Sequence, residues 1–246
     1  MRRAWLIARK DIREVFGRRA VVLRALIPAL VLPVVYGAMV GHEIQAAQER
    51  PDRAAAALGA TLPLFAAIIA VVGALLAIMI TADAIAGEKE RRTIESLLAT
   101  PASDLEIFVG KVMAALMPAL VSGYLSGGIF FLAARLASGG HALPAVPATL
   151  AAARIILFGV PIIAVVLASL GVMVSARCST AASAQQLSGT VFLPVSGLAI
   201  YGSLQITRWS TARLALLMAA LVILCALLLR LGARALGREE LVARLD

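Results

Sequence analysis

The sequence of 246 residues contains few of the side chains that metal sites and enzyme active sites use. It has two cysteines and two histidines, and only 15% of its residues are charged. Cys178 and Cys225 give no disulfide framework, and Cys225 is most simply a small apolar packing residue. His42 and His141 cannot form a histidine cluster, and HEIQA at His42 lacks the second histidine of the HExxH zinc motif. The sequence therefore predicts no metal site and no disulfide.

Catalytic motifs are missing as well. There is no GxxxxGK[ST] phosphate-binding loop, since Gly110-Lys111 lacks the first glycine and the hydroxyl residue. Ser126 and Ser196 each precede a glycine in an apolar run, but no apolar run holds a histidine that could act as a base. No acidic pair lies in the middle of such a run, so a carboxylate relay for protons or sodium is not visible. We expect that the chain is not an enzyme and binds no cofactor itself.

What the chain has instead is apolar sequence, with 61% hydrophobic residues. A helix needs about 20 mostly apolar residues to cross about 30 Å of hydrocarbon, and six runs are long enough. They cover about 20–40, 58–82, 112–134, 154–175, 181–205 and 211–231. No remaining segment could form a soluble enzyme core. We predict one all-α integral membrane domain over residues 1–246, with six transmembrane helices.

The net charge is +9, and the distribution of the basic residues agrees with this topology. No basic domain interleaved with aromatic residues is present, so nucleic acid is not expected as a partner. Sixteen of the 23 Lys and Arg residues fall on the side that holds both termini, six fall on the other side, and Arg24 can snorkel from the first span. The positive-inside rule places the termini and residues 83–111 in the cytoplasm of a cell-membrane protein. Residues 41–57 and 135–153 are predicted to be outer loops.

Residues 1–19 form a basic amphipathic segment. Trp5, Ala8 and Ile12 recur at helical spacing, while Arg9 and Arg13 lie largely elsewhere around the helix. Such a helix lies in the membrane interface, with its tryptophan at headgroup depth. We predict that this segment is retained and is not a signal peptide.

The longest charged run, DAIAGEKERRTIESLLATPASDLEIFVGK, covers residues 83–111 between spans two and three. Apolar residues at helical spacing predict a short amphipathic helix within 84–100, which Pro101 ends. Ser103-Asp104-Leu105-Glu106 matches a capping box and starts the next helix. An ordinary solvated loop is the alternative that the pattern leaves open. Charge pairs at helical spacing are Glu88–Arg91, Glu88–Arg92 and Arg91–Glu95.

The same run resembles the first cytoplasmic loop of ABC-2 type transporter permeases, a group that includes sodium and multidrug exporters. Arg92 stands where many members carry glycine, and Ile94 replaces the common leucine. The run covers less than an eighth of the chain, but the spans on both sides fit the same family. The matching parts, in order, are Glu88 to Arg91, Thr93-Ile94-Glu95, Leu97-Leu98, Thr100-Pro101 and Gly110-Lys111.

The resemblance implies a coupling helix that docks on a separate ATPase, which would be present in two copies and would bind ATP and Mg. Residues 1–19 would be a connecting helix that also contacts this ATPase. The chain would be the permease subunit of an ATP-driven exporter, working as a homodimer or heterodimer. The alternative is an ATP-independent carrier, channel or scaffold, although the two related halves common in carriers are not visible. The implied coupling residues are Glu88, Lys89, Glu90, Arg91, Arg92, Thr93, Glu95, Leu97, Leu98 and Pro101.

The fifth span is the most polar. Polar groups at membrane depth bond to neighbouring helices or line a wet path, so helix packing, a pathway and a dimer seam all remain open. Gly123 and Gly127 form a GxxxG in the third span, which predicts close helix packing. The sequence does not indicate the substrate. The polar candidates in the fifth span are Gln185, Gln186, Ser188, Thr190, Ser196 and Tyr201.

Overall fold

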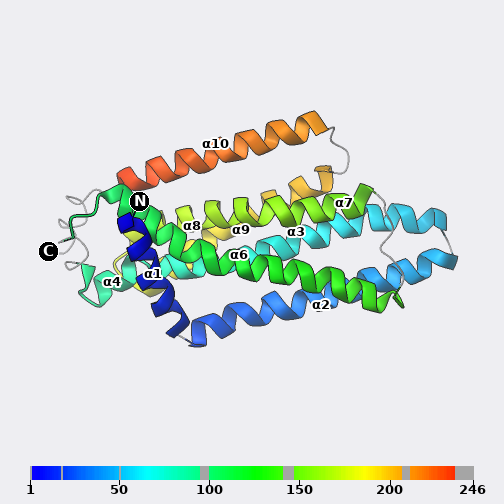
Figure 1. Ribbon diagram of the computed structural model, residues 1–246, viewed down its shortest axis with the longest axis horizontal. Coiled ribbons are helices and arrows are strands. Elements are labelled where there is room, and N and C mark those ends of the chain that lie inside the picture. Colours follow the sequence, from blue (N-terminus) through cyan, green and yellow to red (C-terminus); the bar gives the residue numbers. More distant parts are fainter. Residues whose placement is uncertain are drawn as a thin grey trace.

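The computed structural model describes residues 2–17, 19–49, 51–94, 100–140, 147–206 and 211–235. Every regular element within these ranges is a helix, and the long helices form an elongated bundle (Figure 1). The predicted all-α architecture is therefore confirmed. The elements are α1 Arg2–Gly17, α2 Arg19–Glu49, α3 Pro51–Asp83, α4 Ala86–Glu90, α6 Asp104–Ala137, α7 Pro147–Arg154, the π-helical turn η1 Ile155–Gly159, α8 Val160–Arg177, α9 Ala181–Ile206 and α10 Thr211–Ala235.

Five helices are long and apolar enough to cross a membrane, and they correspond to the first five predicted spans. The predicted sixth span, 211–231, falls in α10, whose described apolar part Ala219–Gly232 is shorter, so a sixth span stays a prediction. The start of α1 and the end of α10 lie at the same end of the bundle (Figure 1). The five candidate spans are Ile27–Ala46, Ala57–Glu90, Asp104–Ala137, Pro147–Arg177 and Ala181–Gln205.

The helices run beyond the predicted spans. With 34 residues, α6 is about 50 Å long at 1.5 Å per residue, compared with about 30 Å of hydrocarbon. The outer loop predicted for 41–57 was wrong, because α2 continues to Glu49 and α3 begins at Pro51. These helix ends project at the end of the bundle opposite α1 (Figure 1). Polar residues mark where a span reaches water, but they do not end a helix whose backbone bonds are satisfied internally.

The third span begins as the sequence predicts. Ser103 is the N-cap of α6, and its Oγ accepts a hydrogen bond from the Glu106 amide at 3.2 Å. In return, the Ser103 amide donates to Glu106 Oε2 at 3.2 Å. The capping box is therefore confirmed. At the other end, α6 continues to Ala137, inside the segment 135–153 that was predicted to be a loop, and α7 also begins inside that segment.

Hydroxyl groups on α6 bind carbonyls that prolines leave free in other helices. Pro33 has no amide hydrogen for the carbonyl of Ala29, four residues earlier, and Ser126 Oγ donates to that oxygen at 2.6 Å. Pro161 likewise cannot bond the carbonyl of Leu157 in the π-helical turn, and Tyr124 Oη donates to it at 3.0 Å. These bonds join α6 to α2 and to η1 and remove the cost of unsatisfied backbone groups in an apolar setting.

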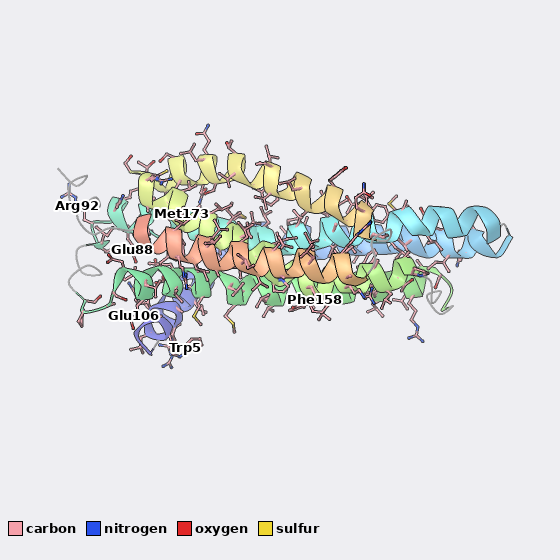
Figure 2. The ribbon with its side chains drawn as sticks, turned by 90° about the horizontal axis from the view of Figure 1, so that it is seen from above. Trp5, Glu88, Arg92, Glu106, Phe158 and Met173 are labelled. Atoms are coloured by element: carbon pink, nitrogen blue, oxygen red, sulfur yellow. The ribbon has the colours of Figure 1, made fainter. Side chains whose placement is uncertain are left out.

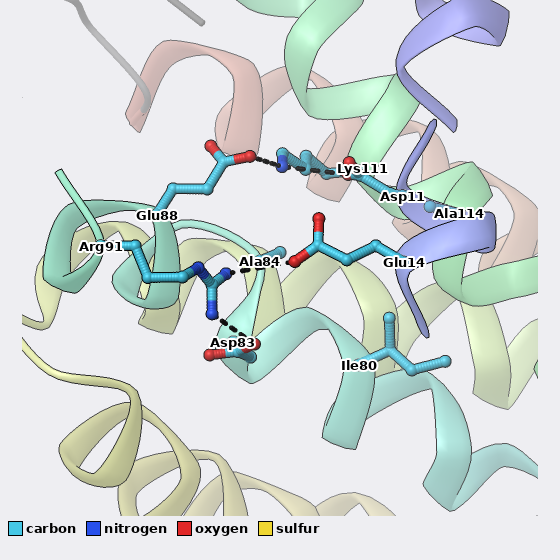
Figure 3. Close-up of a pocket in the computed structure, with 9 residues that line it drawn as sticks. All are labelled: Asp11, Glu14, Ile80, Asp83, Ala84, Glu88, Arg91, Lys111 and Ala114. Carbon is cyan, nitrogen blue, oxygen red and sulfur yellow. Dashed lines mark hydrogen bonds and ion pairs between the residues drawn. The ribbon is translucent and has the colours of Figure 1, made fainter. Parts of the chain in front are cut away.

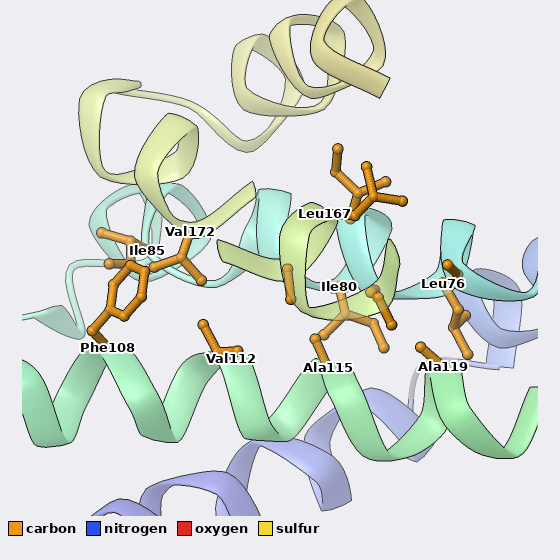
Figure 4. Packing of buried hydrophobic residues seen from close by; sticks show 14 of the residues in the cluster. Leu76, Ile80, Ile85, Phe108, Val112, Ala115, Ala119, Leu167 and Val172 are labelled. Atoms are coloured by element: carbon orange, nitrogen blue, oxygen red, sulfur yellow. The ribbon is translucent and has the colours of Figure 1, made fainter. Parts of the chain in front are cut away.

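The apolar core is built around α3, which packs on α2, α6, α8 and α9. Near α1 and α4, one cluster of buried residues surrounds Phe108, Val112 and Leu167 (Figure 4). A second cluster, including Leu62 and Phe130, fills the opposite half of the bundle. Because α3 is enclosed by the other helices, a displacement at either end of it must move its neighbours.

Glycines bring α3 and α6 into backbone contact. A Cβ atom added at Gly73 would overlap the backbone of Gly123, while one added at Gly123 would overlap Val160. Gly127, one turn further along, lies against Ile156 in the same way. The structure thus places the GxxxG glycines at close contacts between helices, the arrangement in which small residues join membrane helices.

We predict that Gly73→Ala lowers the stability of the protein, because its methyl group would press against backbone that cannot rotate away. Overpacking of this kind costs about 1–3 kcal/mol. Gly128→Ala is the matched control, since a Cβ there meets nothing within 4 Å, and alanine is the better helix former. Thermal unfolding in detergent should show a lower midpoint for Gly73→Ala only. Equal midpoints for the two variants would contradict the backbone contact.

Candidate functional site

A sharp corner joins α3 to α4, and Ser175 near the end of α8 holds it. Ser175 Oγ accepts hydrogen bonds from the amides of Ile85 at 3.0 Å and Ala86 at 2.9 Å. The same hydroxyl donates to the carbonyl of Ala82 at 2.7 Å. Amides at a helix start and carbonyls at a helix end lack partners within their own helix. One fully buried serine side chain therefore completes both helix ends and fixes the corner to α8.

The helix α4 is shorter than the sequence predicts, because it ends in a Schellman motif. The amide of Thr93 donates to the carbonyl of Glu88, and that of Arg92 to Lys89. Arg92 has a φ of 55°, in the left-handed region that suits glycine and costs other residues about 1–2 kcal/mol. This explains why glycine is common at this position in the loop that the sequence resembles. The continuous helix predicted within 84–100 is interrupted at residues 91–93, Ile94 is helical again, and residues 95–99 lie outside the described ranges.

The charged residues of α4 bind other helices instead of each other. Lys89 Nζ donates to the carbonyl of Ala176 at 2.7 Å and to that of Cys178 at 3.5 Å, at the end of α8. Glu90 Oε2 accepts a hydrogen bond from the Ala181 amide, the first of α9, at 3.0 Å. A cation at a helix C-terminus and an anion at a helix N-terminus both complement the helix dipole. We call residues 86–93, α4 with its following turn, the α4 junction.

Glu88 points in the opposite direction, into a buried ionic cluster. Its Oε1 lies 2.7 Å from Lys111 Nζ on α6, and the same ammonium lies 3.0 Å from Asp11 Oδ2 on α1 (Figure 3). The side chain of Lys111 is 2% exposed, that of Glu88 7% and that of Asp11 13%. We call these three residues the Lys111 node. It joins α1, the α4 junction and α6 through one shared cation.

More exposed charges surround the node. Arg91 lies 3.6 Å from Glu14 on α1 and 3.7 Å from Asp83 at the end of α3. Lys10 is 3.9 Å from Glu88 Oε1 but is 63% exposed. Exposed pairs contribute about 0–1 kcal/mol each, whereas removing one member of a buried pair costs about 3–5 kcal/mol. The Lys111 node therefore contributes more free energy to the site than the exposed pairs around it.

A small cavity of about 40 Å³ lies between the Lys111 node and the more exposed Glu14, Asp83 and Arg91 (Figure 3). Glu88 Oε2 is buried and has no hydrogen-bond partner among the described residues. The cavity is large enough for water, which needs about 10–15 Å³ of this kind of volume. Four carboxylates line it, yet no three acidic, histidine or cysteine side chains in the described ranges are arranged to hold a metal ion.

The predicted coupling residues therefore lie in different settings. Glu88 is buried, whereas Arg91, Arg92, Thr93 and Pro101 are exposed. Figure 2 shows Arg92 and Glu106 at the same end of the bundle as Glu88. The predicted pairs Glu88–Arg91 and Glu88–Arg92 are replaced by the contacts described above. Outside the described ranges lie Glu95, Leu97 and Leu98, and with Glu95 the predicted Arg91–Glu95 pair.

Sequence reasoning missed the roles of Asp11, Lys111 and Ser175. Lys111 was noted only as part of a Gly-Lys motif, although an ionisable residue at the start of an apolar span is itself a signal. Asp11 shares a helical face with Ala4 and Ala8, both buried. A carboxylate on such a small-residue stripe needs a buried partner. Ser175 carried no signal, because its bonds depend on how α8 packs against the corner.

Most polar candidates of the fifth span face outward from α9. Gln185, Gln186 and Thr190 are exposed, and Tyr201 is 64% exposed. Ser196 is partly exposed and its hydroxyl donates to its own helix. Of the six, only Ser188 is buried, and its hydroxyl has no partner among the described residues. None of these side chains lines the cavity beside the Lys111 node.

We predict that Ser175→Ala lowers stability, because two buried amides and one carbonyl would lose their shared partner. A buried polar group left unsatisfied costs about 1–3 kcal/mol. Ser169→Ala is the matched control, because Ser169 is equally buried on the same helix but its hydroxyl has no partner among the described residues. Thermal unfolding should separate the two variants by several degrees. A Ser169→Ala midpoint as low as that of Ser175→Ala would contradict the role given to Ser175.

Among curated proteins, no match is found. Residues 5–208 match the family described as ABC-2 family transporter protein. The match covers most of the chain and includes nearly all of α1, the α4 junction, the Lys111 node and α9. With its long apolar helices, the chain is a multi-pass membrane protein, and it belongs to the ABC-2 family of transporter proteins.

Proposed function

We propose that this chain is the permease subunit of an ATP-driven exporter and that a separate ATPase docks at the α4 junction. The family is one of membrane transport proteins, and the proposal adds the energy source and the docking surface. One observation carries it: the α4 junction, at one end of the bundle, is bonded to five longer helices. Those helices are α1, α3, α6, α8 and α9.

Force on the exposed turn after α4 would reach the membrane helices by two routes. Lys89 and Glu90 bind the end of α8 and the start of α9, so a shift of α4 moves the hairpin between them. Glu88 binds the Lys111 node and so acts on α1 and α6. Arg91 and Arg92 are exposed and positioned to contact a partner, whereas Glu88 transmits within the chain. The coupling role predicted for Leu97 and Leu98 stays a prediction.

The proposal places the α4 junction, and both termini, in the cytoplasm of a cell membrane. The excess of basic residues on that side supports this orientation. ATP and Mg would bind to the ATPase and not to this chain, which has no phosphate-binding loop sequence. Closure of two ATPase subunits on ATP would press on two α4 junctions and tilt two permeases between inward-open and outward-open states.

We further propose that α9 faces the second permease. Gln185, Gln186 and Thr190 are exposed along a helix that has the composition of a membrane span. Side-chain amides facing hydrocarbon would lack hydrogen-bond partners, at a cost of several kcal/mol each. A second copy, or a water-filled path between the two copies, would satisfy them. The remaining choice between homodimer and heterodimer depends on whether this chain pairs with itself.

The docking surface is tested by purifying the tagged protein from native membranes in mild detergent. We expect an ATP-binding subunit to co-purify with the wild type and to be reduced at least tenfold by Arg92→Glu. Arg135→Glu is the control, because Arg135 is also exposed but lies near the opposite end of α6. Repeated recovery of the folded protein without an ATP-binding partner would favour a carrier or channel. Equal recovery with Arg92→Glu would move the docking surface elsewhere.

The dimer face is tested by disulfide cross-linking in membranes, with Cys178 and Cys225 replaced by serine. Under mild oxidation, Gln186→Cys should give a covalent dimer. Val222→Cys on α10 is the control, because it is 59% exposed and is expected to face lipid. A dimer from Val222→Cys but not from Gln186→Cys would place the interface on α10. No dimer from either variant would contradict self-pairing through α9.

A further inference from the structure

We propose that Lys111 is a positioning residue that makes α1 move together with the α4 junction when the transporter cycles. The inference rests on the proposed function, because it assumes that a nucleotide-driven partner moves α4. Its basis is the buried node itself. One ammonium is shared by a carboxylate from α1 and a carboxylate from α4, at 3.0 and 2.7 Å.

Because Lys111 is buried, separating it from either carboxylate is costly. If α4 moved away with Glu88 while α1 stayed in place, the ion pair between the Glu88 carboxylate and the Lys111 ammonium would break. Both side chains are more than nine-tenths buried. Buried charges interact strongly and are costly to leave unpaired. The other ionic links between α1 and α4 are longer and exposed, with Arg91 and Glu14 at 3.6 Å and both over 40% exposed. The node is therefore the connection that can carry force between these elements.

Small groups also contribute to the contact between α1 and α6. Ala4 and Ala8 are buried, and Gly110 on α6 lies against the backbone of Ala4 and the side chain of Ile7. Small side chains allow close approach, but they bury little apolar area and so contribute little stabilisation each. The larger side chains of Trp5 and Leu6 are 46% and 57% exposed. Asp11 and Lys111 add a buried ionic connection from α1 to α6 and, through Glu88, to α4.

Figure 1 shows α1 crossing the end of the bundle at a steep angle to the long helices. Trp5 projects from it to one side of the bundle (Figure 2). A helix in this orientation, with an exposed tryptophan and arginines, suits the membrane interface. Motion of α4 that reaches α1 through Lys111 would therefore shift an element that suits the headgroup region.

The test follows α1 and α4 separately in the assembled transporter, in a background without native cysteines. An environment-sensitive fluorophore on Arg9→Cys reports α1, and one on Thr93→Cys reports the α4 junction. Nucleotide is trapped with ATP and vanadate. In the wild-type background, we expect both labels to change their emission. With Asp11→Asn, the response at position 9 should fall at least fivefold while the response at position 93 is retained.

Matched variants separate positioning from folding. Glu14→Gln removes the same charge from the same helix but breaks only an exposed pair, so both responses should persist. Asp11→Glu keeps the charge and should restore the response at position 9. Survival of that response in both Asp11→Asn and Lys111→Met would overturn the inference. Loss of both responses in Asp11→Asn would also overturn it, because the node would then be merely structural. Absence of any response in the wild-type background, with no ATPase bound, would instead remove the proposed function.

Discussion

The structure depends on keeping a buried ammonium paired in a bundle that has few charges. Lys111 enters the apolar interior with the first turns of α6, and its position is acceptable only because Asp11 and Glu88 approach it from two other helices. This requirement fixes where α1 lies and which way α4 faces. Because both carboxylates come from elements outside the long bundle, the same ion pair that satisfies the charge also ties the end of the bundle together.

The long helices are held by contacts of a different kind. Hydrophobic contrast between a helix and lipid is small, so membrane helices associate through close packing and hydrogen bonds. Gly73 and Gly123 let two backbones touch, and hydroxyls of α6 bind carbonyls freed by Pro33 and Pro161. These contacts make the bundle stiff along its length. A displacement at the α4 junction would then pass to the helices as tilting, because local bending would break these bonds.

The sequence predicted features that depend on local chemistry. The capping box at Ser103 and the apolar length of five spans need only neighbouring residues or composition, and both are present in the structure. It failed where distant contacts compete with local ones. The helix α4 ends at Glu90 in a Schellman turn, and its Lys89 and Glu90 bind α8 and α9 instead of local partners. A charge pattern at i and i+4 cannot reveal such partners, since they lie about 90 residues away in the sequence.

The Lys111 node holds α1 against α6 and the α4 junction. Hydrogen–deuterium exchange of the full-length protein in membranes tests it most directly, by comparing the wild type with Lys111→Met. The account predicts faster exchange in peptides covering residues 2–17 of the variant, with the exchange of α3 and of α8 near Leu167 unchanged. Equal exchange of residues 2–17 in the two proteins would contradict the account, because α1 would then be held by its small apolar contacts alone.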